Sequence, residues 1–304
     1  MSQTAVAESD TGPALKDPAL KDLARRNGLT AAGRLPSLGE YTRQLWNFRY
    51  FIWEFAGAKV SAALGNTRLG MIWQVLTPLL NAAVYYLIFG VLIQTSRGVH
   101  HFVAYLCIGV FIFGFTQSTV QAGVQAVSGN LGLIRALHFP RASMPIAVAL
   151  IEARNMIASM VVLIVIVLGF GEPITVEWLL VIPALVLQTI FNAGAAMLVS
   201  RLGSKLHDLR QLIPFIMRVW LYGSAVIYPV SQFEHRIHSP VLLAIVEANP
   251  MLVFVELMRH ALMSGVKLAN SPLVLWSEAI AWTIVMGIGG FVYFWRGEKG
   301  YGRG

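Results

Sequence analysis

The chain has few charged residues and a single cysteine. Asp, Glu, Lys and Arg together make up 12% of the 304 residues, about half of the roughly 25% that soluble domains carry. A soluble protein of this length would need far more polar surface, so the composition argues against a soluble fold. The lone Cys107 excludes a disulfide framework and a cysteine-based metal site. Its apolar neighbours predict a small packing residue.

The signatures of the common enzyme chemistries are also absent. The sequence contains no G-x-x-x-x-G-K-[ST] phosphate loop, no H-E-x-x-H and no G-x-S-x-G, so it cannot hydrolyse ATP through such a loop. His100 and His101 are adjacent, and adjacent residues do not share a helix face, which favours a polar contact over a metal site. Residues 1–40 lack the apolar segment of a cleavable signal peptide and predict a flexible cytoplasmic tail. We expect no catalytic residue, metal or cofactor in this chain.

Long apolar segments are what the sequence does contain. Six of them occur, at residues 69–95, 102–120, 146–170, 178–200, 212–230 and 279–295. Each approaches or exceeds the ~20 residues that cross a hydrocarbon core. Uniformly apolar runs of this length are helices and not barrel strands. We therefore predict an all-α integral membrane protein whose six-helix transmembrane domain occupies residues 69–304.

Positive charge is unevenly distributed between these segments. With the amino terminus in the cytoplasm, 17 of the 23 Lys and Arg residues fall on the cytoplasmic side. The remainder are Arg97, Arg236, Arg259 and Lys267 outside, and Arg154 and Arg218 within segments. Loop positive charge sets membrane orientation, so both termini are predicted to be cytoplasmic in a multi-pass protein of the plasma (inner) membrane. The net charge of +8 then reflects loops that face anionic headgroups, and not nucleic-acid binding.

Three stretches outside the six segments have their own patterns. Residues 41–68 alternate aromatic and charged side chains, which predicts an amphipathic helix in the headgroup plane or, alternatively, a helix packed on the cytoplasmic side. Residues 121–144 form a cytoplasmic loop. Residues 231–275 contain two short apolar stretches, 240–246 and 250–263, which predict an external re-entrant helix pair in the outer leaflet or an ordinary external loop.

Two pairs of opposite charges lie within apolar stretches of the sequence. Glu152 and Arg154 are two residues apart, so on a helix they diverge and are not expected to bond directly. Each is expected to reach the membrane interface or another helix. Glu256 and Arg259 are three residues apart, and we expect a surface pair worth a few tenths of a kcal/mol.

Four short motifs follow one another along the chain. They are Leu69-Gly70-Met71-Ile72-Trp73 with Pro78, the run from Leu133-Ile134-Arg135 to Phe139-Pro140-Arg141, Asp208 with Ser224 and Tyr228-Pro229, and Asn249-Pro250-Met251 with Arg259. In this order and spacing they resemble the ABC-2 permeases that export polysaccharides. The most similar group exports O-antigen, teichoic acid and capsule, and includes actinobacterial exporters of lipid-linked galactan. Two departures are Ala63-Leu64-Gly65, where relatives carry an Arg-Tyr-Lys cluster, and Ala225, where they carry proline.

The resemblance implies an assembly and a substrate. It implies a homodimer bound to two copies of a separate ABC ATPase, which would bind ATP and Mg²⁺. The implied substrate is a glycan on a polyprenyl pyrophosphate lipid. The residues expected to form or flank the ATPase contact are Leu133, Ile134, Arg135, His138, Phe139, Pro140 and Arg141. The alternative is that Arg135 and Arg141 only enforce topology.

A glycan path calls for aromatic faces, on which sugar C–H groups stack without fixed hydrogen bonds. The aromatic candidates are Trp73, Tyr85, Tyr86, Phe89, Trp220, Tyr222 and Tyr228. The alternative is an interfacial aromatic belt. Arg68 and Arg218 are candidates for the pyrophosphate, and the alternative is contact with ordinary lipid headgroups.

Three other function classes remain open at this point. An ABC-2 permease for a drug or a lipid would share the six-span fold. A membrane enzyme acting on lipid-linked sugars would need converging acids or histidines, and His207 with Asp208 is the only close juxtamembrane pair. A secondary transporter would have more spans, inverted repeats and intramembrane acids. An adjacent ATPase gene would separate the transporter from the enzyme.

Overall fold

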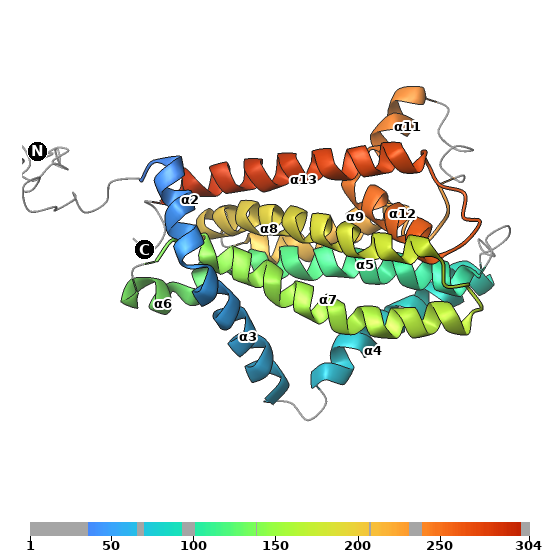
Figure 1. Cartoon of the computed structure of the whole chain (residues 1–304), viewed down its shortest axis with the longest axis horizontal. Coiled ribbons are helices and arrows are strands. Elements are labelled where there is room, and N and C mark those ends of the chain that lie inside the picture. Colours follow the sequence, from blue (N-terminus) through green and yellow to red (C-terminus); the bar gives the residue numbers. More distant parts are fainter. Residues whose placement is uncertain are drawn as a thin grey trace, which may run out of the picture. The chain divides into compact units, whose positions relative to one another are not determined.

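The structure is a computed structural model that describes residues 36–65, 70–92, 101–137, 139–206, 208–230 and 239–298. The helices in these ranges belong to the unit Leu38–Gly304 (Figure 1). They are α2 (Leu38–Asn47), α3 (Arg49–Gly65), α4 (Gly70–Tyr85), η2 (Tyr86–Leu92), α5 (Phe102–Gly123), η3 (Ser128–Asn130), α6 (Leu131–Ala136), α7 (Ser143–Gly169), η4 (Val176–Leu180), α8 (Val181–Lys205), α9 (Leu209–Tyr222), α11 (Pro240–Glu247), α12 (Pro250–Leu262) and α13 (Pro272–Trp295). No strand occurs in the described ranges, and the prediction of an all-α membrane protein is confirmed.

Five helical segments are long and apolar enough to cross a membrane. They are Val75–Leu92, Phe102–Gly123, Ser143–Gly169, Val176–Lys205 and Pro272–Trp295. They correspond to the first, second, third, fourth and sixth apolar segments of the sequence. The last helix begins at Pro272, before its predicted start at residue 279. In the first span, helix α4 contains Pro78 and continues into the π-helical turn η2.

Helices α5, α7, α8 and α13 run side by side through the bundle (Figure 1). Helix α8 packs closely along α13, and both α7 and α8 pack along α5. Where α8 meets α13, a Cβ atom on Gly290 would clash with the carbonyl oxygen of Gly194. Small residues allow membrane helices to approach to backbone contact, so these two glycines set the α8–α13 distance.

Helix α5 forms the centre of the bundle. Of the five candidate spans it is the most enclosed, because 78% of an apolar 18-residue stretch within it is buried inside the chain. Thr116 Oγ1 donates to Asn192 Oδ1 (2.8 Å), and the Gln188 side-chain amide donates to the Ile112 carbonyl (2.9 Å). Polar groups shielded from water need such partners, so these bonds tie α5 to α8.

The fifth apolar segment is not one continuous helix. Helix α9 ends at Tyr222, Gly223 follows as its C-cap, and Ala225 adopts a φ of 50°. Residues with a Cβ atom rarely adopt this left-handed conformation. The prediction of a helix from residue 212 to residue 230 was therefore wrong. Hydropathy reports that the segment is apolar, but it does not report where the backbone turns.

Arg259 explains how this turn is held. Its guanidinium is fully buried, donates to the carbonyls of Ala225 (2.9 Å) and Val226 (2.8 Å), and lies over the Tyr105 ring. Glu256 Oε1 lies 3.2 Å from Nη1 of the same guanidinium. The prediction of a weak surface pair was wrong, because α12 packs between α5 and α13 and carries the pair into the interior.

The segment predicted to be external contains the two predicted helices, α11 and α12, and they separate at Asn249-Pro250 as expected. Asn249 Oδ1 accepts hydrogen bonds from the Met251 N–H (3.1 Å) and the Trp220 indole N–H (2.9 Å). Its amide donates to the Gly223 carbonyl (2.9 Å). Asn249 therefore joins the end of α9 to the start of α12. Because α12 is buried among its neighbours, it does not rest in lipid as predicted.

The stretch predicted as one interfacial helix forms two helices, α2 and α3, with a break at Phe48. One face is enclosed, since Tyr41 is 1% and Ile52 5% exposed. The other face presents aromatic rings, with Trp46 67% and Trp53 55% exposed. A membrane-surface location for the exposed face remains a prediction.

Glu172, in the loop after α7, joins three helix ends. Its buried carboxylate lies 2.8 Å from His101 Nδ1, and it accepts hydrogen bonds from the Ser264 N–H and hydroxyl (2.9 Å each). Burial raises the pKa of this carboxyl, but the bonds from Ser264 and His101 outweigh that effect and leave the pKa below its ordinary value. His101 thus makes a polar contact, as expected, and His100 lies outside the described residues.

Candidate functional site

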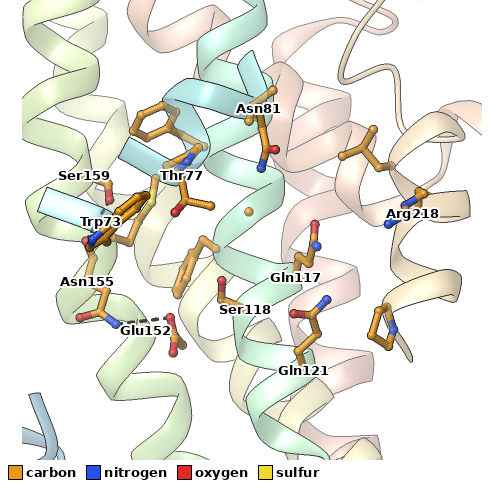
Figure 2. A pocket seen from close by; sticks show the side chains of 18 of the residues that line it. Trp73, Thr77, Asn81, Gln117, Ser118, Gln121, Glu152, Asn155, Ser159 and Arg218 are labelled. Carbon is orange, nitrogen blue, oxygen red and sulfur yellow. Dashed lines mark hydrogen bonds between the residues drawn. The ribbon is translucent and has the colours of Figure 1, made fainter. Parts of the chain in front are cut away.

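A groove with polar walls lies between α4, α5, α7 and α9 (Figure 2). Its volume is about 580 Å³. The side chains with polar atoms in its wall are Trp73, Thr77, Asn81, Tyr85, Gln117, Ser118, Gln121, Glu152, Asn155, Ser159 and Arg218. Most of these groups are neutral amides and hydroxyls. The groove is therefore suited to weak hydrogen bonding over a large area.

Helical periodicity explains why these side chains share the groove. Within each helix they recur at three or four residues: Thr77, Asn81 and Tyr85 on α4, Gln117 and Gln121 on α5, and Glu152, Asn155 and Ser159 on α7. Residues at this spacing lie on one face of a helix. Polar groups are costly inside a membrane and are found where they line a polar cavity or mark a substrate pathway. Three polar stripes that converge on one space therefore identify a candidate pathway.

The two charged side chains of the groove lie on different walls. Glu152 projects from α7, and Arg218 projects from α9 across the groove (Figure 2). The Asn155 amide donates to Glu152 Oε2 (3.4 Å). Arg218 is exposed, and it is close enough to Tyr85 to interact electrostatically with that hydroxyl. Its charge is therefore available to a ligand that enters the groove.

Arg154 faces away from the groove, although it is only two residues from Glu152. Its guanidinium donates to the Trp53 carbonyl (3.1 Å) and stacks 4.2 Å from the Trp53 ring centre. A Cβ atom on Gly57 would lie 2.6 Å from Nη1, so the guanidinium lies directly against this glycine. The expectation that Glu152 and Arg154 diverge, and that Arg154 reaches another helix, is confirmed.

Three of the residues predicted for the substrate path or the pyrophosphate line the groove: Trp73, Tyr85 and Arg218. The other described candidates do not occur in its described wall; they are Tyr86, Phe89, Trp220, Tyr222 and Tyr228. The Trp220 indole is bonded to Asn249, and the Tyr228 hydroxyl donates to the Tyr222 carbonyl. Arg68 and His138 lie outside the described residues.

Sequence reasoning missed the amides and hydroxyls of the groove. It selected aromatic and charged residues because these are uncommon in apolar segments. The missed signal was the repeated spacing of Thr, Asn, Gln and Ser in three segments already predicted to be helices, one of which extends past its predicted end at residue 120 to include Gln121. That spacing predicts a polar face on each helix, but it does not show that the three faces meet.

The predicted coupling motif divides into an exposed and an enclosed part. On α6, Ile134 is buried (7% exposed) and Arg135 is exposed. Arg141 is engaged within the chain: its guanidinium donates to the Glu298 carbonyl, and its N–H donates to the Glu298 carboxylate (3.1 Å). The remaining members are half-buried or buried: Leu133, Phe139 and Pro140. Arg135 is therefore better placed than Arg141 to meet another protein.

Comparison with known proteins identifies the family of this chain. Residues 52–263 match the family described as ABC-2 type transporter. Among curated proteins, the O-antigen export system permease protein RfbA of Myxococcus xanthus is 22% identical over 210 residues (69% of this chain, 79% of the relative). A protein of the same name from Klebsiella pneumoniae is 23% identical over 217 residues (71% and 81%). The polysialic acid transport protein KpsM of Escherichia coli is 24% identical over 208 residues (68% and 79%). With a family match across most of its length and several membrane-spanning helices, this chain belongs to the ABC-2 type transporter family.

Proposed function

We propose that the chain is the transmembrane subunit of an ATP-driven exporter. It moves a polysaccharide linked to polyprenyl pyrophosphate from the cytoplasm across the plasma membrane. The observation that carries this proposal is the convergence of three polar stripes in one groove. The relatives are named for export of O-antigen and transport of polysialic acid, which supports a polysaccharide substrate.

The chemistry of the groove suits a sliding glycan. Sugar hydroxyls both donate and accept hydrogen bonds, and so do amide side chains such as Gln117 and Gln121. Because equivalent partners recur along the wall, one bond can form as another breaks. Trp73 and Tyr85 add ring faces on which sugar C–H groups can stack. No single contact holds the glycan tightly, as repeated movement requires.

Arg218 is our candidate for the pyrophosphate. A guanidinium forms strong charge-assisted hydrogen bonds with phosphate oxygens, and this one projects from an exposed position on α9 into the groove. Arg68 is a second candidate, from its position just before α4 in the sequence.

Two copies of the chain and two copies of a separate ATPase make up the proposed exporter. ATP and Mg²⁺ bind to the ATPase, because this chain has no phosphate loop. Helix α4 with η2 is only 6% buried within the chain, which leaves an apolar surface on which a second copy can pack. The exposed face of α6, including Arg135, meets the ATPase. Both termini are cytoplasmic, and α9 with the turn after it provides the fifth of six crossings.

The test is reconstitution. The chain is purified with its co-expressed ATPase, placed in vesicles, and supplied with a polyprenyl-pyrophosphate oligosaccharide, the unglycosylated carrier lipid, or a hydrophobic drug. We expect ATP-dependent translocation of the glycosylated carrier alone. Carriers bearing galactan, O-antigen and teichoic acid units are compared in the same assay. Equal stimulation of ATP hydrolysis by the drug or the bare carrier would support a drug or lipid permease instead.

A groove variant sharpens this test. Replacing Gln117 and Gln121 by leucine removes two amides from the wall and leaves the apolar packing of α5 in place. We expect export to fall roughly tenfold, the factor for about one lost hydrogen bond per passing sugar. Gln44→Leu, an exposed amide on α2, is the matched control and is expected to export normally.

A further inference from the structure

The two residues before α7 are hydrogen-bonded to side chains that are distant in the sequence. The N-cap residue of this helix, Ala142, has no side-chain acceptor. The Arg141 N–H donates to Glu298 Oε1 (3.1 Å), and the Ala142 N–H donates to the Tyr41 hydroxyl oxygen (3.1 Å). N–H groups at a helix start lack partners within the helix, and supplying acceptors stabilises it. The N–H groups of Ser143 and Met144 are bonded to the carbonyls of Pro140 and Arg141, so Glu298 and Tyr41 supply acceptors to the two residues immediately before the helix.

The side chains of Tyr41 and Glu298 are also hydrogen-bonded to each other. The Tyr41 hydroxyl donates to Glu298 Oε2 (2.8 Å), while the Arg141 guanidinium donates to the Glu298 carbonyl. A continuous path of hydrogen bonds thus joins α2, the residues before α7 and the turn after α13. The partners are 101, 157 and 257 residues apart in sequence. Only the folded chain brings these three segments together.

The path lies in an enclosed site. Tyr41 is 1% exposed, and Ala142 and Phe294 are fully buried beside it. Burial raises the pKa of the Glu298 carboxyl above its ordinary value, although the bonds from Arg141 and Tyr41 act in the opposite direction. Hydrogen bonds shielded from water are costly to break singly, because each leaves an unpaired group behind.

Helix α6 packs on the same cluster. Its Ile134 lies in the apolar cluster that contains Tyr41, while Arg135 on the same helix is exposed. The Phe139 ring, between α6 and α7, packs 5.3 Å from the Phe51 ring of α3. A displacement of the exposed face of α6 would therefore pass through packed side chains to α2 and α3.

We propose that Tyr41 and Glu298 are positioning residues that lock the coupling segment (α6 with residues 139–142) to α2 and to the turn after α13. The three then move as one body. Because α3 follows α2 and packs along α7, the motion reaches a wall of the groove. The force that moves this body comes from the partner ATPase, so this part of the proposal rests on the proposed function. The lock itself is a property of this chain alone.

The lock is tested first in the purified full-length permease. Spin labels are attached at Arg43→Cys on α2 and Gly132→Cys on α6, in a chain that also carries Cys107→Ala and is diluted with unlabelled protein. A Cβ atom on Gly132 would meet open space, and Arg43 is exposed. We expect a narrow distance distribution that becomes about twofold broader in both lock variants. Tyr41→Phe removes the bonds to Glu298 and from Ala142, and Glu298→Gln removes one acceptor oxygen.

The controls are matched in chemistry. Tyr50→Phe and Glu54→Gln make the same substitutions at exposed positions on α3, and both should keep the narrow distribution. A distribution that stays narrow in both lock variants would overturn the proposal. Tyr41→Phe removes a single oxygen and introduces no new polar group, so it still tests the proposal if Glu298→Gln fails to fold.

The second measurement is the amount of glycan exported per ATP hydrolysed by the complete complex. We expect both lock variants to hydrolyse ATP at nearly the normal rate and to export roughly tenfold less per ATP, about the effect of one charge-assisted hydrogen bond. Unchanged export per ATP would overturn the coupling role. If the normal protein neither binds an ATPase nor exports a glycan, the proposed function fails, and the spin-label result still decides whether the lock exists.

Discussion

The first and second membrane spans are similar in hydropathy and opposite in environment. Only 6% of Val75–Leu92 is buried within the chain, whereas 78% of Phe102–Gly123 is enclosed by its neighbours. Lipid tails are as apolar as leucine, so hydrophobicity alone does not draw one helix to the centre and leave another outside. The two spans differ in how closely their side chains let other helices pack and in the hydrogen bonds they form within the bundle.

Specific residues of the two spans account for this difference. In α5, a Cβ atom on Gly109 would lie 2.7 Å from the Val226 carbonyl oxygen, so glycine allows the turn after α9 to pack against the helix. In α4, Thr77 and Asn81 face the groove, and Pro78 removes one backbone hydrogen bond from the helix. One span is therefore built for packing, and the other is built to border a polar space.

The largest expected effect is on the enclosed side, at Arg259. Arg259→Met leaves the Ala225 and Val226 carbonyls and the Glu256 carboxylate without their buried partner. We expect a loss of about 3–5 kcal/mol in the free energy of unfolding. Thermal unfolding in detergent measures it, with Arg218→Met in the groove as the control. A normal melting temperature for Arg259→Met would show that the turn is held by other contacts.

The next prediction compares the first and second spans directly. Phe113→Ala in α5, where the side chain is fully buried, should lower the free energy of unfolding by about 3 kcal/mol through the cavity it leaves. Leu87→Ala in η2, where the side chain is 57% exposed, should change it by less than about 0.5 kcal/mol. The measurement is made on the monomer in detergent, because a second copy packed on this surface would enlarge the loss. A large loss for Leu87→Ala in the monomer would break the comparison.

A third prediction concerns function on the groove side. Arg218→Ala should reduce the initial rate of lipid-linked glycan export about tenfold, as expected for a lost charge-assisted contact, while the melting temperature stays unchanged. Arg218→Lys retains the charge without the bidentate geometry, so its export rate should lie between those of the normal chain and Arg218→Ala. Arg210→Ala, exposed at the start of α9, is the control. Normal export by Arg218→Ala would remove this residue from the pathway.

The smallest effect is at Glu172, where the start of α5 meets two loops. Its pKa is lowered in the folded protein, so its stabilising effect is fully present above the unfolded pKa of about 4.3. That effect is lost as the pH falls through the lower folded pKa. Melting temperatures measured between about pH 5 and pH 3 should decline more steeply in the normal chain than in Glu172→Gln. Parallel curves would contradict the assigned bonds.

Much of the fold could be predicted because membrane helices are defined by local composition. Length and apolarity located five candidate spans, and the two short helices on either side of Asn249-Pro250 were expected from their lengths. The end of α9 could not be predicted in this way. The turn there is stabilised by Asn249 and Arg259, which follow it in the sequence by more than twenty residues.

The candidate site was predicted only in part. Trp73, Tyr85 and Arg218 were selected from the sequence and do line the groove. The amides and hydroxyls were not selected, because a polar residue at helical spacing can equally face another helix. Gln188 and Asn192 show this alternative, since they also lie four residues apart but bond within the core.

The sequence by itself determined that this is a helical membrane protein, where most of its spans lie and which family it resembles, because these depend on local composition and short motifs. Only the tertiary structure decided which span became the core, that Arg259 is buried, and that Tyr41, Arg141 and Glu298 meet. The physical reason is that hydrocarbon treats all apolar faces alike. Close packing and hydrogen bonds between distant residues then decide which face turns inward.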